Sequence, residues 1–174
     1  MDQCARMPAP DQSADSWAGW LEAQGNVFFL YARQHTRTES DAKDVLQDAL
    51  TEAWRVEGGK IPGKGLVFTI IRRRAIDLGR SIDRRSRREM DFVGNNSGWF
   101  VPDYTAADTG ESLSAAIQEL PDKLREVLVL RIWGELSFPE IAKVAEIPQA
   151  TATSRYRYAL ERLRECETLN ELKT

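Results

Sequence analysis

Five hydrogen-bonding side chains lie close together at the start of a predicted helix near the C-terminus: Thr151, Thr153, Ser154, Arg155 and Arg157. Hydroxyl and guanidinium groups of this kind donate hydrogen bonds to base edges in the major groove of DNA and to its phosphates. The chemistry that they indicate is recognition of nucleic acid.

Residues 137 to 165 supply the elements that position these side chains. Ser137 and Glu140 have the spacing of a capping box, and Pro148 ends the first helix and opens the second. Apolar residues then recur at helical spacing: Ile141, Ala142, Ala145, Ala152, Tyr156, Ala159, Leu160 and Leu163. The pattern predicts a helix-turn-helix that reads DNA. The alternative is an αα-hairpin that only packs.

A second candidate surface is strongly basic. The 174-residue chain has a net charge of −3, but residues 60 to 88 carry a local balance of +8, which leaves −11 for the remainder. Binding follows such local fields rather than the total charge. A helix is predicted from Leu66 to about Met90, and arginine is suited to phosphates because its planar fork donates in pairs. A solvated basic face, balanced by the acidic helix before it, is the alternative.

An amphipathic helix precedes this basic segment. Its apolar stripe consists of Ala42, Val45, Leu46, Ala49, Leu50, Ala53 and Trp54, and Thr38 or Ser40 can cap it. The opposite face carries Asp44, Gln47, Asp48, Thr51 and Glu52. By composition alone such a face is usually just solvated.

The remaining segments complete an all-α plan of two small helical domains joined by a flexible linker. Residues 1–14 are polar and predicted to be disordered, and a helix over Trp17 to Tyr31 is expected to break near Gly25 and Asn26. Residues 93–112 lose all periodicity and form the predicted linker. The predicted domains therefore span residues 15–92 and 113–174.

Several other kinds of chemistry lack the residues they need. Gly58, Gly63 and Lys64 have the spacing of a phosphate-binding loop, but Gly65 replaces the magnesium-binding hydroxyl and no strand precedes it. Cys4, Cys166 and the single His35 lack metal-ligand spacing, so we expect no metal or cofactor and treat all three as structural or incidental. With no signal peptide or membrane span in the sequence, we expect a cytoplasmic protein.

Taken together, these segments resemble the extracytoplasmic-function (ECF) group of bacterial RNA polymerase sigma factors, which keeps sigma domains 2 and 4. DAKDVLQDALTEAW at 41–54 is similar to the family's helix that binds core polymerase, and FTIIRRRAIDLGRS at 68–81 to its reader of the minus-10 promoter element. Residues 120–165 match domain 4, which reads the minus-35 element.

The resemblance implies a role for each surface in a non-enzymatic specificity subunit that directs polymerase to promoters and helps to open them. It implies core-polymerase contacts from Asp44, Gln47, Asp48 and Thr51. For the minus-10 element it implies Lys60, Lys64, Arg73, Asp77, Arg80 and Arg84. For the minus-35 element it implies Thr151, Thr153, Ser154, Arg155 and Arg157. The implied partners are core RNA polymerase, promoter DNA and an anti-sigma factor, and we expect a monomer when free, without membrane insertion.

The chain departs from the family pattern at some positions. Leu66-Val67 replace a common Trp-Leu pair, and Arg73 replaces an Asn, which bears on promoter melting and minus-10 choice. Ala150, Ala152 and Tyr156 depart in the recognition helix, where we expect altered packing rather than a lost fold. Two alternatives stay open: a free-standing helix-turn-helix regulator, and a degenerate sigma-like module that binds protein without discriminating DNA.

Overall fold

The structure is a computed structural model that describes residues 12–88 and 116–171, with side chains described over 17–84 and 116–165. Its helices in chain order are α1 (Gln12–His35), α2 (Glu39–Val56), α3 (Lys64–Arg88), α5 (Asp122–Ile132), α6 (Phe138–Ala145) and α7 (Gln149–Glu171). No strand occurs in the described ranges, and the predicted all-α fold class is confirmed. The predicted linker at 93–112 lies outside the described residues.

Helix α1 is longer and more continuous than the sequence predicted. It begins at Gln12, inside the stretch 1–14 that we expected to be disordered, and it runs through Gly25 and Asn26 without a break. Phe28 and Tyr31 on the following turns are fully buried. Burial of these rings outweighs the roughly 1 kcal/mol that a glycine costs in a helix interior.

Helix α2 follows the predicted pattern except at its end. The backbone N–H of Asp41 donates to Thr38 Oγ1 over 3.0 Å, so Thr38 is the N-cap, and Val45 and the alanines of the stripe are buried. Trp54 is different, because 51% of it is exposed although we predicted it in the core stripe. The chain turns at Gly58 and Gly59 with positive φ angles, and the indole packs on that turn instead of on the core.

Helix α3 begins at Lys64 and ends at Arg88, two residues earlier at each end than predicted. Its buried face consists of Val67, Phe68, Ile70, Ile71 and Ala75. Leu78 and Ile82, which we also predicted to face inward, are half-buried.

The helix-turn-helix forms as the sequence predicted. The backbone N–H of Ser137 donates to Glu140 Oε2 over 2.8 Å, which closes the capping box of α6. The Ser137 hydroxyl also donates to this carboxylate, and the two hydrogen bonds hold the pKa of Glu140 below its usual value. Helix α7 begins directly after Pro148, and Ala152, Ala159 and Leu163 on its inner face are buried.

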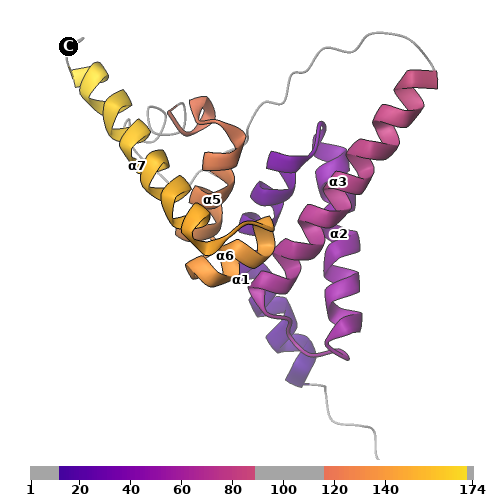
Figure 1. Cartoon of the computed structure of the whole chain (residues 1–174). Helices are drawn as coiled ribbons and strands as arrows, with labels where there is room; N and C mark the ends of the chain where they lie inside the picture. Colours follow the sequence, from indigo (N-terminus) through magenta and orange to yellow (C-terminus); the bar gives the residue numbers. More distant parts are fainter. Residues whose placement is uncertain (1–11, 89–115, 172–174) are drawn as a thin grey trace, which may run out of the picture.

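The two helical groups pack against each other through a shared core. Figure 1 shows α6 between α3 and α7, which diverge toward their C-terminal ends. Phe68 of α3 packs edge-on against Phe28 and Tyr31 of α1, with ring centroids 4.9 and 5.1 Å apart. A Cβ atom on Gly134 would lie 3.1 Å from Phe68 Cε2. The turn after α5 therefore lies directly on α3, a contact that the sequence did not predict.

Candidate protein- and nucleic-acid-binding surfaces

The acidic face of α2 is a continuous solvent-exposed surface. Asp44, Gln47, Asp48 and Thr51 are all exposed, and Thr51 Oγ1 donates back to the carbonyl oxygen of Gln47 over 2.8 Å. The helix thus presents two exposed carboxylates and an amide to solvent on one face. The structure brings the four predicted polymerase-binding residues together.

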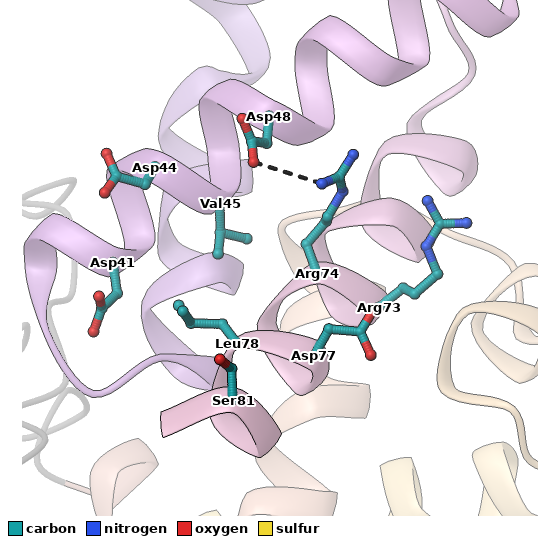
Figure 2. A pocket seen from close by; sticks show the side chains of 9 residues that line it. All are labelled: Asp41, Asp44, Val45, Asp48, Arg73, Arg74, Asp77, Leu78 and Ser81. Carbon is teal, nitrogen blue, oxygen red and sulfur yellow. Dashed lines mark ion pairs between the residues drawn. The ribbon is translucent and has the colours of Figure 1, made fainter. Parts of the chain in front are cut away.

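A groove separates this surface from α3 (Figure 2). Its volume is about 530 Å³, and acidic residues from both helices, two arginines and an apolar floor line it: Asp41, Asp44, Val45, Asp48, Arg73, Arg74, Asp77, Leu78 and Ser81. Asp48 Oδ2 lies 3.6 Å from Arg74 Nη1 across the groove. The groove therefore carries both charge signs on facing helices.

Glu52 ties the arginine end of the groove to α2. It accepts hydrogen bonds from Arg73 and from Arg74, the latter over 2.7 Å. These hydrogen bonds lower the pKa of Glu52, and the same contact raises the pKa of Arg74. Arg73, predicted to lie along the promoter, is consequently held in a fixed orientation beside α2 while 56% of its side chain stays exposed.

The other predicted minus-10 residues differ in their surroundings. Lys60 and Arg84 are exposed, and Arg80 is exposed with Nη1 3.8 Å from Asp77 Oδ1. Lys64 is half-buried, and its Nζ donates to Glu135 of the C-terminal group over 2.6 Å. The structure leaves the first three cations open to solvent and engages Lys64 within the protein.

Exposed apolar side chains flank the turn between α2 and α3. Trp54, Val56 and Ile61 are exposed, and in the sequence they lie on either side of the positive-φ glycines Gly58 and Gly59. Sequence analysis missed this cluster because Trp54 matched the period of the buried stripe. The Gly-Gly pair three residues beyond Arg55 was the available signal that the stripe ends there.

The recognition surface of α7 is only partly exposed. Thr153 and Arg157 are exposed, while Thr151, Ser154 and Arg155 are half-buried. Thr153 Oγ1 and Ser154 Oγ donate to carbonyl oxygens one turn earlier in their own helix, over 3.1 and 2.9 Å. Both hydroxyls keep acceptor capacity, and Arg157 keeps its donors close to the surface, where Glu161 lies 3.9 Å from its Nε.

A buried polar cluster joins the two helical groups. Tyr31 Oη and Arg72 Nε donate to Glu126 Oε1 over 2.9 and 3.1 Å, and His35 Nε2 lies 3.5 Å from the same oxygen. Burial raises the pKa of Tyr31, with the Glu126 charge adding to the effect, and burial lowers the pKa of His35. His35, which we treated as structural or incidental, is part of this buried cluster. The charged residue Glu126 within the apolar run of α5 was the sequence feature that could have indicated a buried polar cluster.

Comparison with known proteins agrees with this arrangement. Residues 116–165 match the family model described as Sigma-70, region 4. Over 131 residues the chain is 33% identical to the ECF RNA polymerase sigma factor RpoE of Cereibacter sphaeroides, covering 72% of each chain. Over 156 residues it is 28% identical to the ECF RNA polymerase sigma factor SigL of Mycobacterium tuberculosis, covering 84% of each chain.

Two solved structures share the fold. The sigma factor RpoE in complex with the anti-sigma factor NepR from Bartonella quintana has a TM-score of 0.67 at 22% identity, covering 88% of this chain and 97% of that one. CnrH in complex with the cytosolic domain of CnrY has a TM-score of 0.53 at 21% identity, covering 94% and 95%. At these identities the similarity establishes the fold.

An all-α chain with an exposed acidic helix, a cationic helix and a capped helix-turn-helix has the architecture of a transcription initiation factor. With the relatives described above, the chain belongs to the ECF family of RNA polymerase sigma factors. It is an alternative sigma factor that directs RNA polymerase to promoters, as the sequence predicted. Within its described residues, the structure contains no helix long and apolar enough to cross a bilayer.

Proposed function

We propose that three surfaces divide the work of promoter recognition, in domains spanning residues 15–92 and 113–174. The exposed face of α2 binds core polymerase through Asp44, Gln47, Asp48 and Thr51. Residues 56–65 and α3 contact the minus-10 element, and the start of α7 contacts the minus-35 element. The chain assists opening of the DNA and has no catalytic site of its own.

The observation that carries this proposal is the position of the acidic face of α2 beside the cationic face of α3. Asp48 pairs with Arg74 of α3 (Figure 2). Glu52 also pairs with Arg74, so the two helices hold a fixed orientation. Polymerase bound on α2 is then adjacent to DNA bound on α3. Core binding and minus-10 recognition occur on one rigid pair of helices.

The turn after α2 is suited to the opened part of the promoter. Lys60 is exposed for phosphate contact, and the exposed Trp54 and Ile61 offer apolar surface beside it. Aromatic stacking contributes about 1–3 kcal/mol per unpaired base, which is comparable to the cost of unstacking one. The cluster thus supports a role in DNA opening.

An anti-sigma factor is the third proposed partner, after polymerase and promoter DNA. Each of the two solved neighbours is in a complex, RpoE with the anti-sigma factor NepR and CnrH with the cytosolic domain of CnrY. A partner that covers the groove between α2 and α3 blocks the proposed polymerase surface. We place these events in the cytoplasm, where polymerase and DNA are found.

Run-off transcription tests this assignment. Purified core polymerase from the source organism is supplied with wild-type protein or with Asp44→Ala/Gln47→Ala on genomic promoter fragments, alongside a pull-down of the core enzyme. We expect wild-type-dependent transcripts and core binding, both lost in the variant. Core binding without transcripts supports the interaction module, and operator binding without core binding supports the free-standing regulator.

A further inference from the structure

The two oxygens of Glu52 bind different arginines of α3. Oε1 accepts a hydrogen bond from Arg73 Nη2, and Oε2 accepts from Arg74 Nε and Nη2 over 3.1 and 2.7 Å. Asp48 Oδ2 lies 3.6 Å from the remaining nitrogen of Arg74, Nη1. Arg74 therefore directs its whole guanidinium to carboxylates of α2. Among the described residues, Arg73 contacts an acceptor through Nη2 alone.

The outer side of Arg73 is open to solvent. Its side chain is 56% exposed, against 22% for that of Glu52. Figure 2 shows the Arg74 side chain pointing to Asp48, and the Arg73 side chain pointing away from the aspartates of α2. A guanidinium group has more N–H donors than the one that Glu52 engages, and all of them lie in one plane. Arg73 therefore keeps donors for a ligand while part of its fork is fixed.

The charges around Arg73 are balanced, which disfavours a phosphate as that ligand. The two arginines carry two positive charges, and Glu52 and Asp48 carry two negative ones, so the group has no net charge. The hydrogen bonds from Arg73 and Arg74 lower the pKa of Glu52, so its negative charge persists at neutral pH. A phosphate on Arg73 would be repelled by this carboxylate, whereas an uncharged base edge would meet only directed donors.

Two other arginines on this face of α3 are less restrained. Arg80 and Arg84 follow Arg73 at helical spacing, so the three share one face over roughly 16 Å. Both are exposed, and Arg80 Nη1 lies 3.8 Å from Asp77 Oδ1. Contact with a phosphate tolerates many side-chain positions, whereas a bidentate contact with a base needs the fork in one orientation. An arginine fixed by a carboxylate thus suits a base, and the less restrained arginines suit phosphates.

We infer that Glu52 is a positioning residue for Arg73, and that the fixed arginine reads a guanine in the double-stranded DNA that α3 contacts. Arginine pairs its planar fork with the two acceptors on the major-groove edge of guanine, and this is the commonest specific contact between a side chain and a base. The inference rests on the proposed function, because it places α3 on promoter DNA. It adds the base that is read and the residue that orients the reader.

Sequence selection during transcription tests the contact. A promoter fragment that core polymerase transcribes with the wild-type protein is randomised across the minus-10 region and its upstream flank. A barcode in the transcribed part of each template identifies it in the transcripts. We expect the wild type to enrich guanine at one position by about tenfold, and Arg73→Ala to remove that enrichment alone. Arg74→Ala should keep it, since the Arg74 guanidinium is directed to α2.

The positioning role of Glu52 is tested in the same selection. In Glu52→Ala the Arg73 fork must be ordered on binding, so we expect the guanine enrichment to fall about threefold. Glu52→Gln keeps an acceptor oxygen and should recover part of it. Adding Glu52→Ala to Arg73→Ala should not alter the base preferences further, whereas a merely structural role would lower transcription of all templates. Glu39→Ala is the matched control, because it removes a glutamate and its ion pair, with Lys43, from the same helix.

Three results would overturn the inference: no guanine enrichment by the wild type, an enrichment that survives in Glu52→Ala, or an equal loss for all templates in Arg73→Ala, which would make Arg73 a phosphate contact. Selection of randomised duplex DNA by the full chain without polymerase, run in parallel, separates this failure from failure of the proposed function. Transcripts without a Glu52-dependent guanine remove the inference alone. Glu52-dependent selection of guanine by the full chain, with no transcripts from the wild type, removes the proposed function alone.

Discussion

Glu52 and Glu126 both bind arginines of α3, but the Glu52 ion pairs lie at the surface and the Glu126 ion pair lies in the interior. Glu52 holds Arg73 and Arg74, whose side chains are 56% and 41% exposed. The Glu126 side chain is 8% exposed and holds Arg72 together with Tyr31. Exposed pairs contribute about 0–1 kcal/mol, whereas removing one partner of a buried pair costs about 3–5 kcal/mol. Three consecutive arginines therefore do different work, because successive helical residues point in different directions.

The largest expected effect is at the interior pair. Glu126→Ala leaves Arg72 and Tyr31 without their shared acceptor, so we expect the free energy of unfolding to fall by about 3–5 kcal/mol. Urea denaturation of the full chain measures it. A loss below about 1 kcal/mol would show that the interior cluster behaves like a surface pair, and the contrast with Glu52 would disappear.

The apolar side of the same junction is tested at Gly134. A Cβ there would lie 2.6 Å from the Leu130 carbonyl oxygen and 3.1 Å from Phe68, so we expect Gly134→Ala to destabilise by about 1–3 kcal/mol. Gly79→Ala in α3 is the matched control, since nothing lies within 4 Å of its Cβ position, and it should stabilise by about 0.5–1 kcal/mol. Equal effects of the two alanines in thermal denaturation would contradict close packing at the turn.

The buried junction should also respond to pH through His35, the single histidine of the chain. Its folded pKa is lowered by burial, with Glu126 and Asp122 opposing and Arg72 adding to the shift, so the unfolded chain binds the proton more readily. The stability that this provides is present above about pH 6.5 and is lost as pH falls below it, by at most about 1.4 kcal/mol per pH unit.

Denaturation midpoints between about pH 5.5 and 7 measure this dependence, and His35→Gln should flatten it. The pKa values of Glu52, Glu135 and Glu140 are lowered, so these carboxyls titrate below the window. A pH dependence that survives in His35→Gln would assign the effect to another group.

The smallest effect is expected at the surface pair. Glu52→Ala removes the acceptor of Arg73 and Arg74, and we expect a loss of about 0–1 kcal/mol that shrinks as salt is added. The measurement is urea denaturation at low and high salt. A loss of stability as large as that of Glu126→Ala and insensitive to salt would show that the Glu52 ion pairs behave like the buried ion pair of Glu126.

Local signals predicted much of the fold. Thr38, Ser137 and Glu140 cap their helices as expected. The apolar stripes of α2 and α7 are buried or half-buried, with the exception of Trp54. These features depend on residues three or four positions apart, which the sequence displays directly. The exposed acidic face of α2 was predictable for the same reason, although its proposed role in polymerase binding came from the family resemblance.

Contacts between distant segments were not predictable. Glu126 meets Arg72 and Tyr31 across more than fifty residues, and Lys64 meets Glu135 across seventy-one. No spacing rule links such partners, so the sequence did not predict the ion pair of Lys64 or the buried polar cluster around His35. The prediction that Trp54 belongs to the buried stripe of α2 was wrong for a related reason, because the position of Trp54 depends on how the glycine turn folds back.

The packing of Phe68 makes the contact between the two helical groups depend on temperature. Its ring lies among Phe28, Tyr31 and the Gly134 turn, so parting the two helical groups exposes aromatic surface to water and raises the heat capacity. Apolar contacts of this kind weaken on cooling, and the desolvation penalty of buried charges falls on warming. Both terms favour contact at higher temperature, so the two halves of the molecule hold together best when warm and loosen in the cold.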